Sequence, residues 1–272
     1  MKKILVQPNS FENLGDVLKT DIDGIILPLE KLSVNSEIYF SLEDIKCILN
    51  LTSKEVCISI NKIMHNEDLD LLENSLVSLN KMNISKIFFY DLSVVNIVKR
   101  LGIKKELVIF QDHLNASLYS NNFYKKRGIS HAVITNDITK DEINEISKYH
   151  SLMLICYGYL PIFYSRRYLI SNYLKYIQKD KESNFYYIKN NDDRYPIVEE
   201  EYGTTIYTRD AINLINEIKD IQVNYIILNA FHTGRKEFLS ILNQYLKCET
   251  DDVSHYVGFI NRKTVYKVAD YE

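Results

Sequence analysis

Short apolar runs alternate with stretches of helical periodicity along the chain. Each run has the length of one β-strand, and most of them stop at a polar residue, as residues 3–7 end at Gln7. Between two such runs, Leu72, Leu76 and Leu79 repeat at the spacing that places apolar side chains on one face of a helix. This alternation of strands and helices is typical of a parallel α/β fold. The predicted strands are residues 3–7, 24–29, 56–61, 86–91, 107–112, 131–136, 152–158 and 225–229.

About eight strands is the number that closes a (β/α)8 barrel, so we expect a TIM-barrel-like α/β fold. The predicted helices are residues 11–19, 42–49, 67–81, 94–101, 115–126, 140–149, 211–219 and 235–247. Two segments depart from the repeat. Residues 161–188 form a long aromatic and basic stretch, and residues 195–207 indicate a small inserted hairpin, which we expect at about residues 186–208.

The end of the chain alternates like a pair of strands around Asn261, so we expect a C-terminal strand tail at about residues 253–272. No internal repeat, low-complexity tract or linker divides the sequence. We therefore predict a single domain that comprises residues 1–272.

Composition places the chain among ordinary globular proteins. Hydrophobic residues make up 46% and charged residues 25% of the 272 positions, which excludes a disordered or collagen-like chain. The formal net charge is −3, so binding to nucleic acid would need a local basic patch. The apolar run at residues 4–6 is too short for a signal peptide, and no run reaches the roughly 18 residues that span a membrane. We expect a cytoplasmic protein with Cys47, Cys57, Cys156 and Cys248 reduced.

Polar residues stand where several predicted strands end, among them Gln111, Asp112, Asn136 and Tyr157. In a parallel barrel the carboxyl ends of the strands meet on one face, where active sites are built. The joint position of these residues therefore predicts a pocket on that face. Taken singly, an Asn or Asp after a strand is more often the cap of the following helix.

Two histidines follow strand ends and would face the same end of the barrel. His113 follows the fifth strand and His232 the eighth, and either could act as an acid, a base or a ligand. For each, the alternative is a surface or capping histidine. The HExxH, GxSxG, Walker and GxGxxG motifs are missing, which argues against the common zinc-peptidase, serine-hydrolase and nucleotide-binding classes, and we predict no metal site. Cys156 could be a nucleophile, but a buried core cysteine is the preferred interpretation.

The most informative segment surrounds two tyrosines. Tyr164 and Tyr168 are four residues apart with Arg166 and Arg167 between them, and Lys175 follows at helical spacing. Aromatic rings stack on bases and cations contact phosphates, so the pattern fits RNA binding. Amphipathic packing, with lysine side chains that reach out to solvent, explains it equally well.

Three segments, taken in order, resemble the peptidase U32 family, the collagenase-like proteins. They are residues 111–115, 136–142 and 157–171, the last of which stands at the place of a family signature of the form HGxLCxxYSGRCLLS. The opening residues 6–14 and the ending at residues 258–268 also resemble short members. The resemblance implies a TIM-barrel-like domain. For the activity it implies either a peptidase of unassigned catalytic type or a protein that hydroxylates RNA pyrimidines or quinones.

The hydroxylating members of the family are similar to one another in carrying an iron–sulfur cluster on cysteines. At the two cysteine positions of the signature this chain has Pro161 and Tyr168, with Arg166 at the glycine position and Tyr157 at the histidine position. Neither proline nor tyrosine can supply the thiolate that such a cluster needs, so we expect no cofactor of this kind.

The leading function implied by the resemblance is tRNA modification through 5-hydroxylation of the wobble uridine. The chain would act either as the hydroxylating protein or as the non-catalytic partner of a longer U32 paralogue in a hetero-oligomer. The candidate catalytic residues are Gln111, Asp112, His113, Asn136, Tyr157 and His232, and the candidate RNA-binding residues are Tyr164, Arg166, Arg167, Tyr168 and Lys175. The alternative is a peptidase that acts on peptide substrates, with a loose candidate set of Asp112, His113, Cys156 and His232. A third interpretation is a binding scaffold that has lost catalysis.

Overall fold

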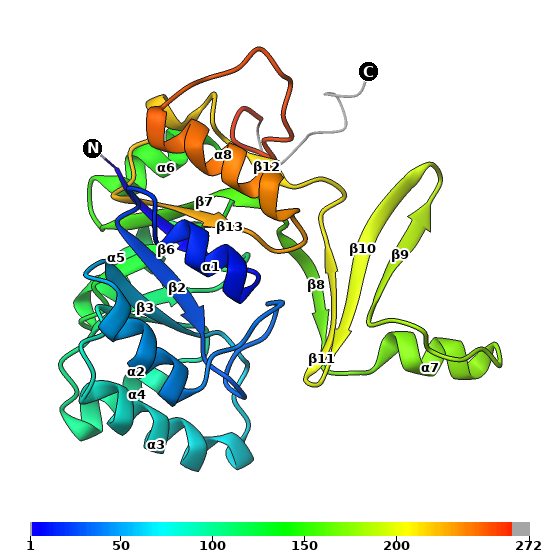
Figure 1. The fold of residues 1–272 in the computed structure, drawn as a ribbon. Helices are drawn as coiled ribbons and strands as arrows, with labels where there is room; N and C mark the ends of the chain where they lie inside the picture. The colour runs from blue at the N-terminus through cyan, green and yellow to red at the C-terminus, as the bar shows by residue number, and fades with distance from the viewer. Residues whose placement is uncertain (1, 263–272) are drawn as a thin grey trace.

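A closed parallel barrel forms the centre of the computed structural model, which describes residues 2–262 (Figure 1). Going round the barrel, the strands are β7 (Leu152–Gly158), β13 (Tyr225–Asn229), β1 (Lys3–Gln7), β2 (Gly24–Pro28), β3 (Glu55–Ile60), β4 (Lys86–Phe89), β5 (Glu106–Phe110) and β6 (His131–Val133), which pairs with β7 again. All the predicted strands are therefore confirmed, and so is the TIM-barrel-like α/β fold.

The barrel strands are mostly continuous runs of Ile, Leu, Val and Phe. Helices cover their outer side and side chains fill the barrel, so both faces of each strand are buried. Strands β2 and β7 are buried along their whole length. Gly24 begins β2 at a point of close approach, because a Cβ added there would stand 2.5 Å from the carbonyl oxygen of Glu55. Glycine thus permits the tight start of the β2 and β3 pairing.

Helices surround the barrel on its outer side (Figure 1). They are α1 (Phe11–Val17), α2 (Leu42–Leu51), α3 (Leu69–Asn80), α4 (Ser93–Leu101), α5 (Leu118–Lys126), α6 (Lys140–Ser147) and α8 (Arg235–Lys247), with a short 3-10 turn, η1 (Asn66–Asp68), before α3. Ser10, Ser41, Ser117 and Thr139 begin four of them by accepting a hydrogen bond from a backbone N–H of the first turn. No helix in the described part of the chain is long and apolar enough to cross a membrane.

The predicted helix at residues 211–219 is wrong. The segment forms the short strand β12 (Ile212–Asn213) and the 3-10 turn η2 (Ile218–Asp220). Strand β7 extends beyond its parallel neighbours, and β12 pairs antiparallel with its last residues, Tyr157 and Gly158. This pairing supplies partners for backbone groups at the end of β7 that would otherwise be buried without any. The Asn213 side chain then accepts a hydrogen bond from the N–H of Ile215 and turns the chain.

Residues 161–207, which we call the insertion, form a separate antiparallel sheet and one helix. It contains β8 (Pro161–Ser165), α7 (Leu169–Tyr176), β9 (Phe185–Asn190), β10 (Asp193–Glu200) and β11 (Gly203–Tyr207), and the strand order is β8, β11, β10, β9. The predicted hairpin at about residues 186–208 is therefore only part of the element. The sheet is larger because residues 161–165 pair with β11, and Pro161 itself lies opposite Tyr207. In Figure 1 the insertion projects to one side of the barrel.

The insertion is attached to the loop that follows β2. Tyr39 donates a hydrogen bond from its hydroxyl to Glu200 Oε1 (3.0 Å), and the backbone N–H of Asn35 donates to Glu200 Oε2 (3.1 Å). Thr205 donates to the Asn35 side-chain oxygen at 2.7 Å. Burial raises the pKa of Glu200. These contacts join β10 and β11 to the barrel.

The predicted C-terminal strand pair is not present in the part that the structure describes. Tyr256 forms a single bridge with Ile212, and the chain then turns at Gly258, whose φ of 59° lies in the left-handed region that favours glycine. After this turn the side chain of Ile260 is buried, and its carbonyl oxygen accepts a hydrogen bond from the N–H of Lys140 at 3.0 Å. The remainder of the predicted tail, residues 263–272, lies outside the described residues.

A charged cluster closes the barrel at the amino-terminal ends of its strands. The Lys86 side chain is only 4% exposed, and its Nζ lies 2.5 Å from Glu55 Oε2 and 3.3 Å from Glu106 Oε2. Lys3 pairs with the other oxygen of Glu55. The ring of Tyr225 stands 5.0 Å from Lys86 Nζ. We call these residues the floor cluster. The cluster lies at the end of the barrel opposite the active sites of this fold, and loss of one of its members would leave a charge there without its partner.

Candidate functional site

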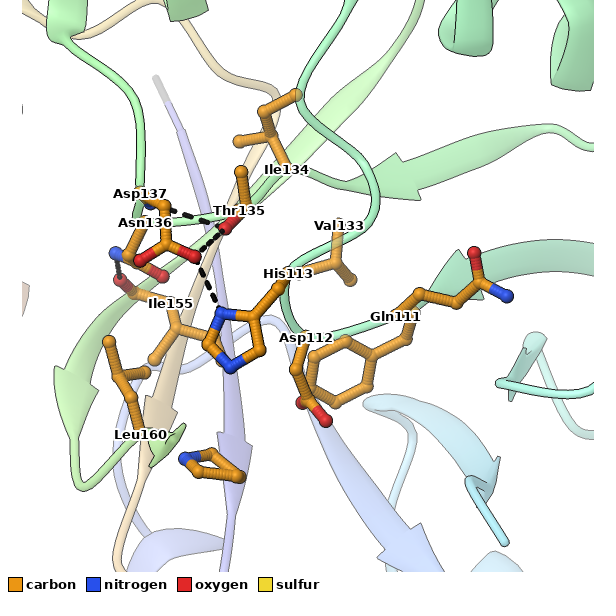
Figure 2. Close-up of a pocket in the computed structure, with 12 residues that line it drawn as sticks. Gln111, Asp112, His113, Val133, Ile134, Thr135, Asn136, Asp137, Ile155 and Leu160 are labelled. Atoms are coloured by element: carbon orange, nitrogen blue, oxygen red, sulfur yellow. Dashed lines mark hydrogen bonds and ion pairs between the residues drawn. The ribbon is translucent and has the colours of Figure 1, made fainter. Parts of the chain in front are cut away.

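A small pocket lies at the carboxyl ends of β5, β6 and β7, where the polar strand ends predict it (Figure 2). Its volume is about 20 Å³, which is room for a single water molecule. The residues that line it are Phe110, Gln111, Asp112, His113, Val133, Ile134, Thr135, Asn136, Asp137, Ile155, Leu160 and Pro161. Two of these, Leu160 and Pro161, come from the turn into the insertion. The pocket therefore lies where the barrel meets the insertion.

His113 and Asp137 form the central pair of the pocket. Nδ1 of His113 lies 2.6 Å from Asp137 Oδ2, and Thr135 donates a hydrogen bond to the same oxygen at 3.0 Å (Figure 2). The hydrogen bond to Asp137 raises the pKa of His113 above its ordinary value. Burial acts to raise the pKa of Asp137, but the bonds from His113 and Thr135 outweigh it and lower this pKa. A carboxylate that holds one ring nitrogen of a histidine is the usual arrangement for a group that transfers protons.

Asp112 supplies a second titratable group beside this pair. Its pKa is raised to about 6, chiefly by burial; His113 acts to lower this pKa, and the carboxylate of Asp137 acts to raise it. A carboxyl group with a pKa of about 6 exchanges its proton readily near neutral pH, which suits general acid and base catalysis.

Asp112 is expected to titrate near pH 6 in the folded protein. Between about pH 4 and pH 6 the folded state then binds more protons than the unfolded state, so the contribution of Asp112 to the free energy of unfolding falls as the pH rises through this window. Carboxyl carbon NMR shifts recorded from pH 3 to pH 8 measure the midpoint. The carboxyl signal that is absent from the spectrum of the Asp112→Asn variant is the signal of Asp112. A midpoint below pH 5 contradicts the assignment.

Gln111 and Asn136 line the pocket and also hold its walls together. Gln111 donates to the carbonyl oxygen of Tyr90 at 3.0 Å and accepts from the hydroxyl of Tyr124 at 3.3 Å. Asn136 donates to the carbonyl oxygen of Ile155 at 2.9 Å, which ties the end of β6 to β7 (Figure 2). Gln111 thus fixes the end of β5, which carries Asp112 and His113, and Asn136 fixes the end of β6, which carries Asp137.

Tyr157 is not among the residues that line this pocket. Its hydroxyl lies 3.2 Å from the hydroxyl of Thr233, and its ring packs 6.0 Å from that of Phe238 in α8. The register between β7 and β13 shifts beside it, between Ile227 and Leu228. Such an irregularity changes the direction of the side chains that follow it.

His232 also follows a strand end, as predicted, but it does not line the pocket with His113. Its φ of 53° is left-handed, its Nδ1 lies 3.3 Å from Glu37 Oε1, and its backbone N–H donates to Glu37 Oε2 at 3.0 Å. The ring packs against Phe231 and Phe185 with centroid distances of 4.0 and 4.4 Å. Within the described residues its buried Nε2 has no hydrogen-bond partner. The two histidines therefore occupy different surroundings.

Sequence reasoning missed Asp137 and Glu37, the two acidic partners of these histidines. Asp137 comes directly after Asn136, so the rule that polar residues follow strand ends would have found it one position further on. Glu37 lies in the loop after β2 and meets His232 only through the tertiary fold, and no local pattern marks it.

The candidate RNA-binding residues all lie on the insertion. The Tyr164 hydroxyl donates to the carbonyl oxygen of Tyr202, and the Tyr168 hydroxyl donates to that of Glu201, each at 2.7 Å. Both hydroxyls thus fasten β8 and the start of α7 to the turn between β10 and β11. The three predicted cations, Arg166, Arg167 and Lys175, are exposed.

The four cysteines do not fit an iron–sulfur cluster. Cys47 in α2 and Cys248 after α8 are exposed, whereas Cys57 and Cys156 are buried in β3 and β7. Burial raises the pKa of Cys57 to about 12 and that of Cys156 further, so neither is a ready thiolate. In residues 2–262 no group of three or more His, Cys, Asp or Glu side chains is placed to hold a metal ion.

The peptidase candidates are not assembled into one site. Asp112 and His113 line the pocket. Cys156, which is buried, and His232 are not among the residues that line it. A nucleophilic mechanism needs nucleophile and base within hydrogen-bond reach of each other, so the proposed set gives no such arrangement.

Comparison with known proteins places the chain among proteins of one family. It is 25% identical over 236 residues to "tRNA hydroxylation protein P2" of Bacillus subtilis (strain 168), which covers 81% of this chain and 76% of that protein. It is 21% identical over 178 residues to "tRNA hydroxylation protein P1" of the same organism, and there the match covers 63% of this chain but only 42% of the relative. A solved structure, the U32 peptidase Mk0906, shares the fold with a TM-score of 0.54 at 11% identity, over 85% of this chain and 93% of that chain. The model of peptidase family U32 matches residues 9–253, and the chain belongs to this family.

Proposed function

We propose that this protein takes part in tRNA hydroxylation, and that the modification it serves is 5-hydroxylation of the wobble uridine. The observation that carries the proposal is the similarity to the tRNA hydroxylation protein P2, which extends over 81% of the chain. The pocket at the carboxyl ends of β5 to β7, with the titratable side chains Asp112, His113 and Asp137 in its lining, supports it. The proposal also assigns the protein to the cytoplasm, where it would meet its tRNA.

The pocket residues suit one step of such a reaction. Replacement of the C5 hydrogen of a pyrimidine by a hydroxyl group is a two-electron oxidation, so an oxidant from outside this chain has to supply the oxygen. The C5 hydrogen then leaves as a proton, which a carboxylate or imidazole beside it can accept. A nucleobase would have to approach from outside the water-sized pocket, where the His113 side chain is 48% exposed. Asp112, with its pKa of about 6, and Asp137 are the carboxyl groups beside that imidazole. Gln111 fixes the strand end that carries Asp112 and His113, and Asn136 fixes the one that carries Asp137.

We further propose that the chain carries no iron–sulfur cluster and works beside a longer U32 paralogue. Pro161 and Tyr168 have no thiol to offer at the signature positions, and Cys57 and Cys156 are buried and protonated. The relative P1 is a longer protein, of which the match covers 42%, and it occurs in the same organism as P2. A hetero-oligomer of a short and a long member accounts for both observations.

Deleting the gene is expected to remove 5-hydroxylated wobble uridine from the tRNA of its host. Mass spectrometry of tRNA nucleosides from the deletion strain and its parent measures this, and re-expression of the gene should restore the modified nucleoside. Other modified nucleosides in the same digest provide the internal control. An unchanged nucleoside profile would contradict the proposed function.

A further inference from the structure

Helix α5 presents aromatic and basic side chains to solvent on the outer side of the barrel. Tyr119, Phe123, Lys126 and Arg127 follow one another at intervals that place them on one side of the helix, and we call these four residues the α5 face. All four are exposed, Tyr119 to 85% and Phe123 to 48%. Open aromatic side chains that lie together, rather than singly, are typical of a binding surface.

Packing of α5 against the barrel does not use the α5 face. The opposite side of the helix carries Leu118 and Tyr124, which pack against the hydrophobic core, and the buried Asn121. The guanidinium of Arg127 lies 4.7 Å from the centre of the Phe123 ring, which holds both side chains on the solvent side. The α5 face is therefore open to a partner.

The α5 face is basic, in contrast to the chain as a whole. Residues 113–136 contain three cations, Lys125, Lys126 and Arg127, and no acidic residue, whereas the formal net charge of the protein is −3. Of the seven helices described around the barrel, only the consecutive helices α4 and α5 contain no Asp or Glu. Within residues 2–262 neither Lys126 nor Arg127 forms an ion pair. Lys125 is not part of the face, because it donates to the carbonyl oxygen of Tyr149 beside the acidic helix α6.

The α5 face begins beside the pocket. Helix α5 follows β5, at whose carboxyl end His113 lines the pocket. The side chain of His113 is 48% exposed, and Leu114 after it is 62% exposed. Tyr119, in the first turn of α5, is the next open aromatic side chain along the sequence. A pocket of about 20 Å³ holds no nucleotide, so a substrate that meets His113 from solvent needs a binding surface outside the pocket.

We propose that the α5 face binds the tRNA beside the base that meets His113. Tyr119 stacks on an unpaired base of the loop, and Lys126 and Arg127 contact phosphates. Single-stranded RNA loops are recognised by stacking on aromatic side chains and by cations along the backbone. Lysine is depleted at protein–protein interfaces, so an unpaired Lys126 beside Arg127 favours a polyanion over a protein. The inference rests on the proposed function and assigns tRNA contact to residues outside the insertion.

Removal of the two cations tests the phosphate contacts. The full chain is titrated into a fluorescently labelled, unmodified tRNA transcript with a wobble uridine, and anisotropy gives the dissociation constant at several salt concentrations. The variant Lys126→Gln/Arg127→Gln is expected to bind about 10- to 100-fold more weakly at about 0.1 M salt. The slope of log affinity against log salt should fall by about 2, roughly 1 for each phosphate contact. The matched control Lys81→Gln/Lys219→Gln removes the same charge at exposed positions after α3 and in η2 and should bind like the wild type.

Substitution of Tyr119 tests the stacking contact in the same titration. Tyr119→Ala is expected to bind about 5- to 100-fold more weakly, the range for loss of one stacked base, whereas Tyr119→Phe keeps the ring and should bind like the wild type. The matched control is Tyr176→Ala, which changes an equally open tyrosine, 85% exposed, in α7, and should leave the affinity unchanged. Thermal unfolding should show that all variants are folded.

The proposal is overturned if Tyr119→Ala or Lys126→Gln/Arg127→Gln binds the transcript as tightly as the wild type, or if the wild type does not bind it. It is also overturned if the control variants lose as much affinity as these two. Variants that bind tRNA normally but no longer associate with the paralogue would show that a protein occupies the α5 face.

The nucleoside analysis of the deletion strain decides the proposed function separately. Loss of the modified uridine on deletion, together with unchanged affinity of the α5 variants, rejects the α5 face and leaves the function standing. An unchanged nucleoside profile, together with weaker binding of these variants, rejects the function and leaves an RNA-binding surface on α5.

Discussion

Replacing His113 with alanine is expected to slow the formation of 5-hydroxylated uridine about 100-fold or more, the range for loss of a general acid or base. His113 is the imidazole of the pocket, and Asp137 holds its Nδ1 at 2.6 Å. The deletion strain is complemented with wild-type or variant protein under an inducible promoter. The appearance of the modified nucleoside after induction is then followed by mass spectrometry.

His65→Ala is the matched control, because His65 is another exposed histidine and does not line the pocket. It should restore the modification fully. The pair of His113 with Asp137 is about half exposed, so its loss costs roughly 1 kcal/mol or less and the variant should remain folded. A folded His113→Ala protein that restores the modification at the wild-type rate would show that His113 takes no part in the reaction.

Replacing Lys86 with alanine is expected to lower the free energy of unfolding by about 3 kcal/mol, because it leaves a cavity where a side chain that is only 4% exposed stood and removes one of the two cationic partners of Glu55. The change also removes the buried stem of the lysine from beside Tyr225. For a chain of this size the midpoint of thermal unfolding should fall by roughly 6 °C or more. Calorimetry or circular dichroism measures this fall.

Lys81→Ala makes the same chemical change at an exposed position just after α3 and should alter the midpoint by no more than about 1 °C. Lys86→Met retains most of the apolar stem and separates the packing contribution from the charge. If Lys86→Ala unfolds at the same temperature as the wild type, Lys86 does not contribute to the stability of the barrel.

The barrel could be predicted from the sequence because its strands carry their signal locally. A parallel strand that is buried on both faces is a continuous apolar run, and each such run stands out from the polar helices around it. The insertion could not be delimited in this way, because no residue of β8 or β9 is fully buried and neither strand forms a continuous apolar run. Its residues alternate too weakly to mark a sheet. The helix predicted at residues 211–219 failed because its backbone pairs with β7, a contact far away in sequence.

The candidate site residues likewise fall into those that could be predicted from the sequence and those that could not. Gln111, Asp112, His113 and Asn136 meet in one pocket because neighbouring parallel strands end at one level, which strand order alone ensures. After an irregularity in strand pairing or in the backbone, the direction of a side chain depends on the tertiary fold and cannot be predicted from the neighbouring sequence. The register shift between β7 and β13 explains why the side chain of Tyr157 does not line the pocket. The left-handed backbone at His232 turns that residue toward Glu37.

The path of the chain through the insertion makes this element exchangeable. Pro161 and Tyr207 lie opposite each other in neighbouring strands, so the polypeptide leaves the barrel and returns to it at almost the same place. A segment whose ends already meet can lengthen, shorten or be replaced without moving the strands on either side. The barrel can thus keep its strands and helices while a single recombination event exchanges the insertion for a different segment.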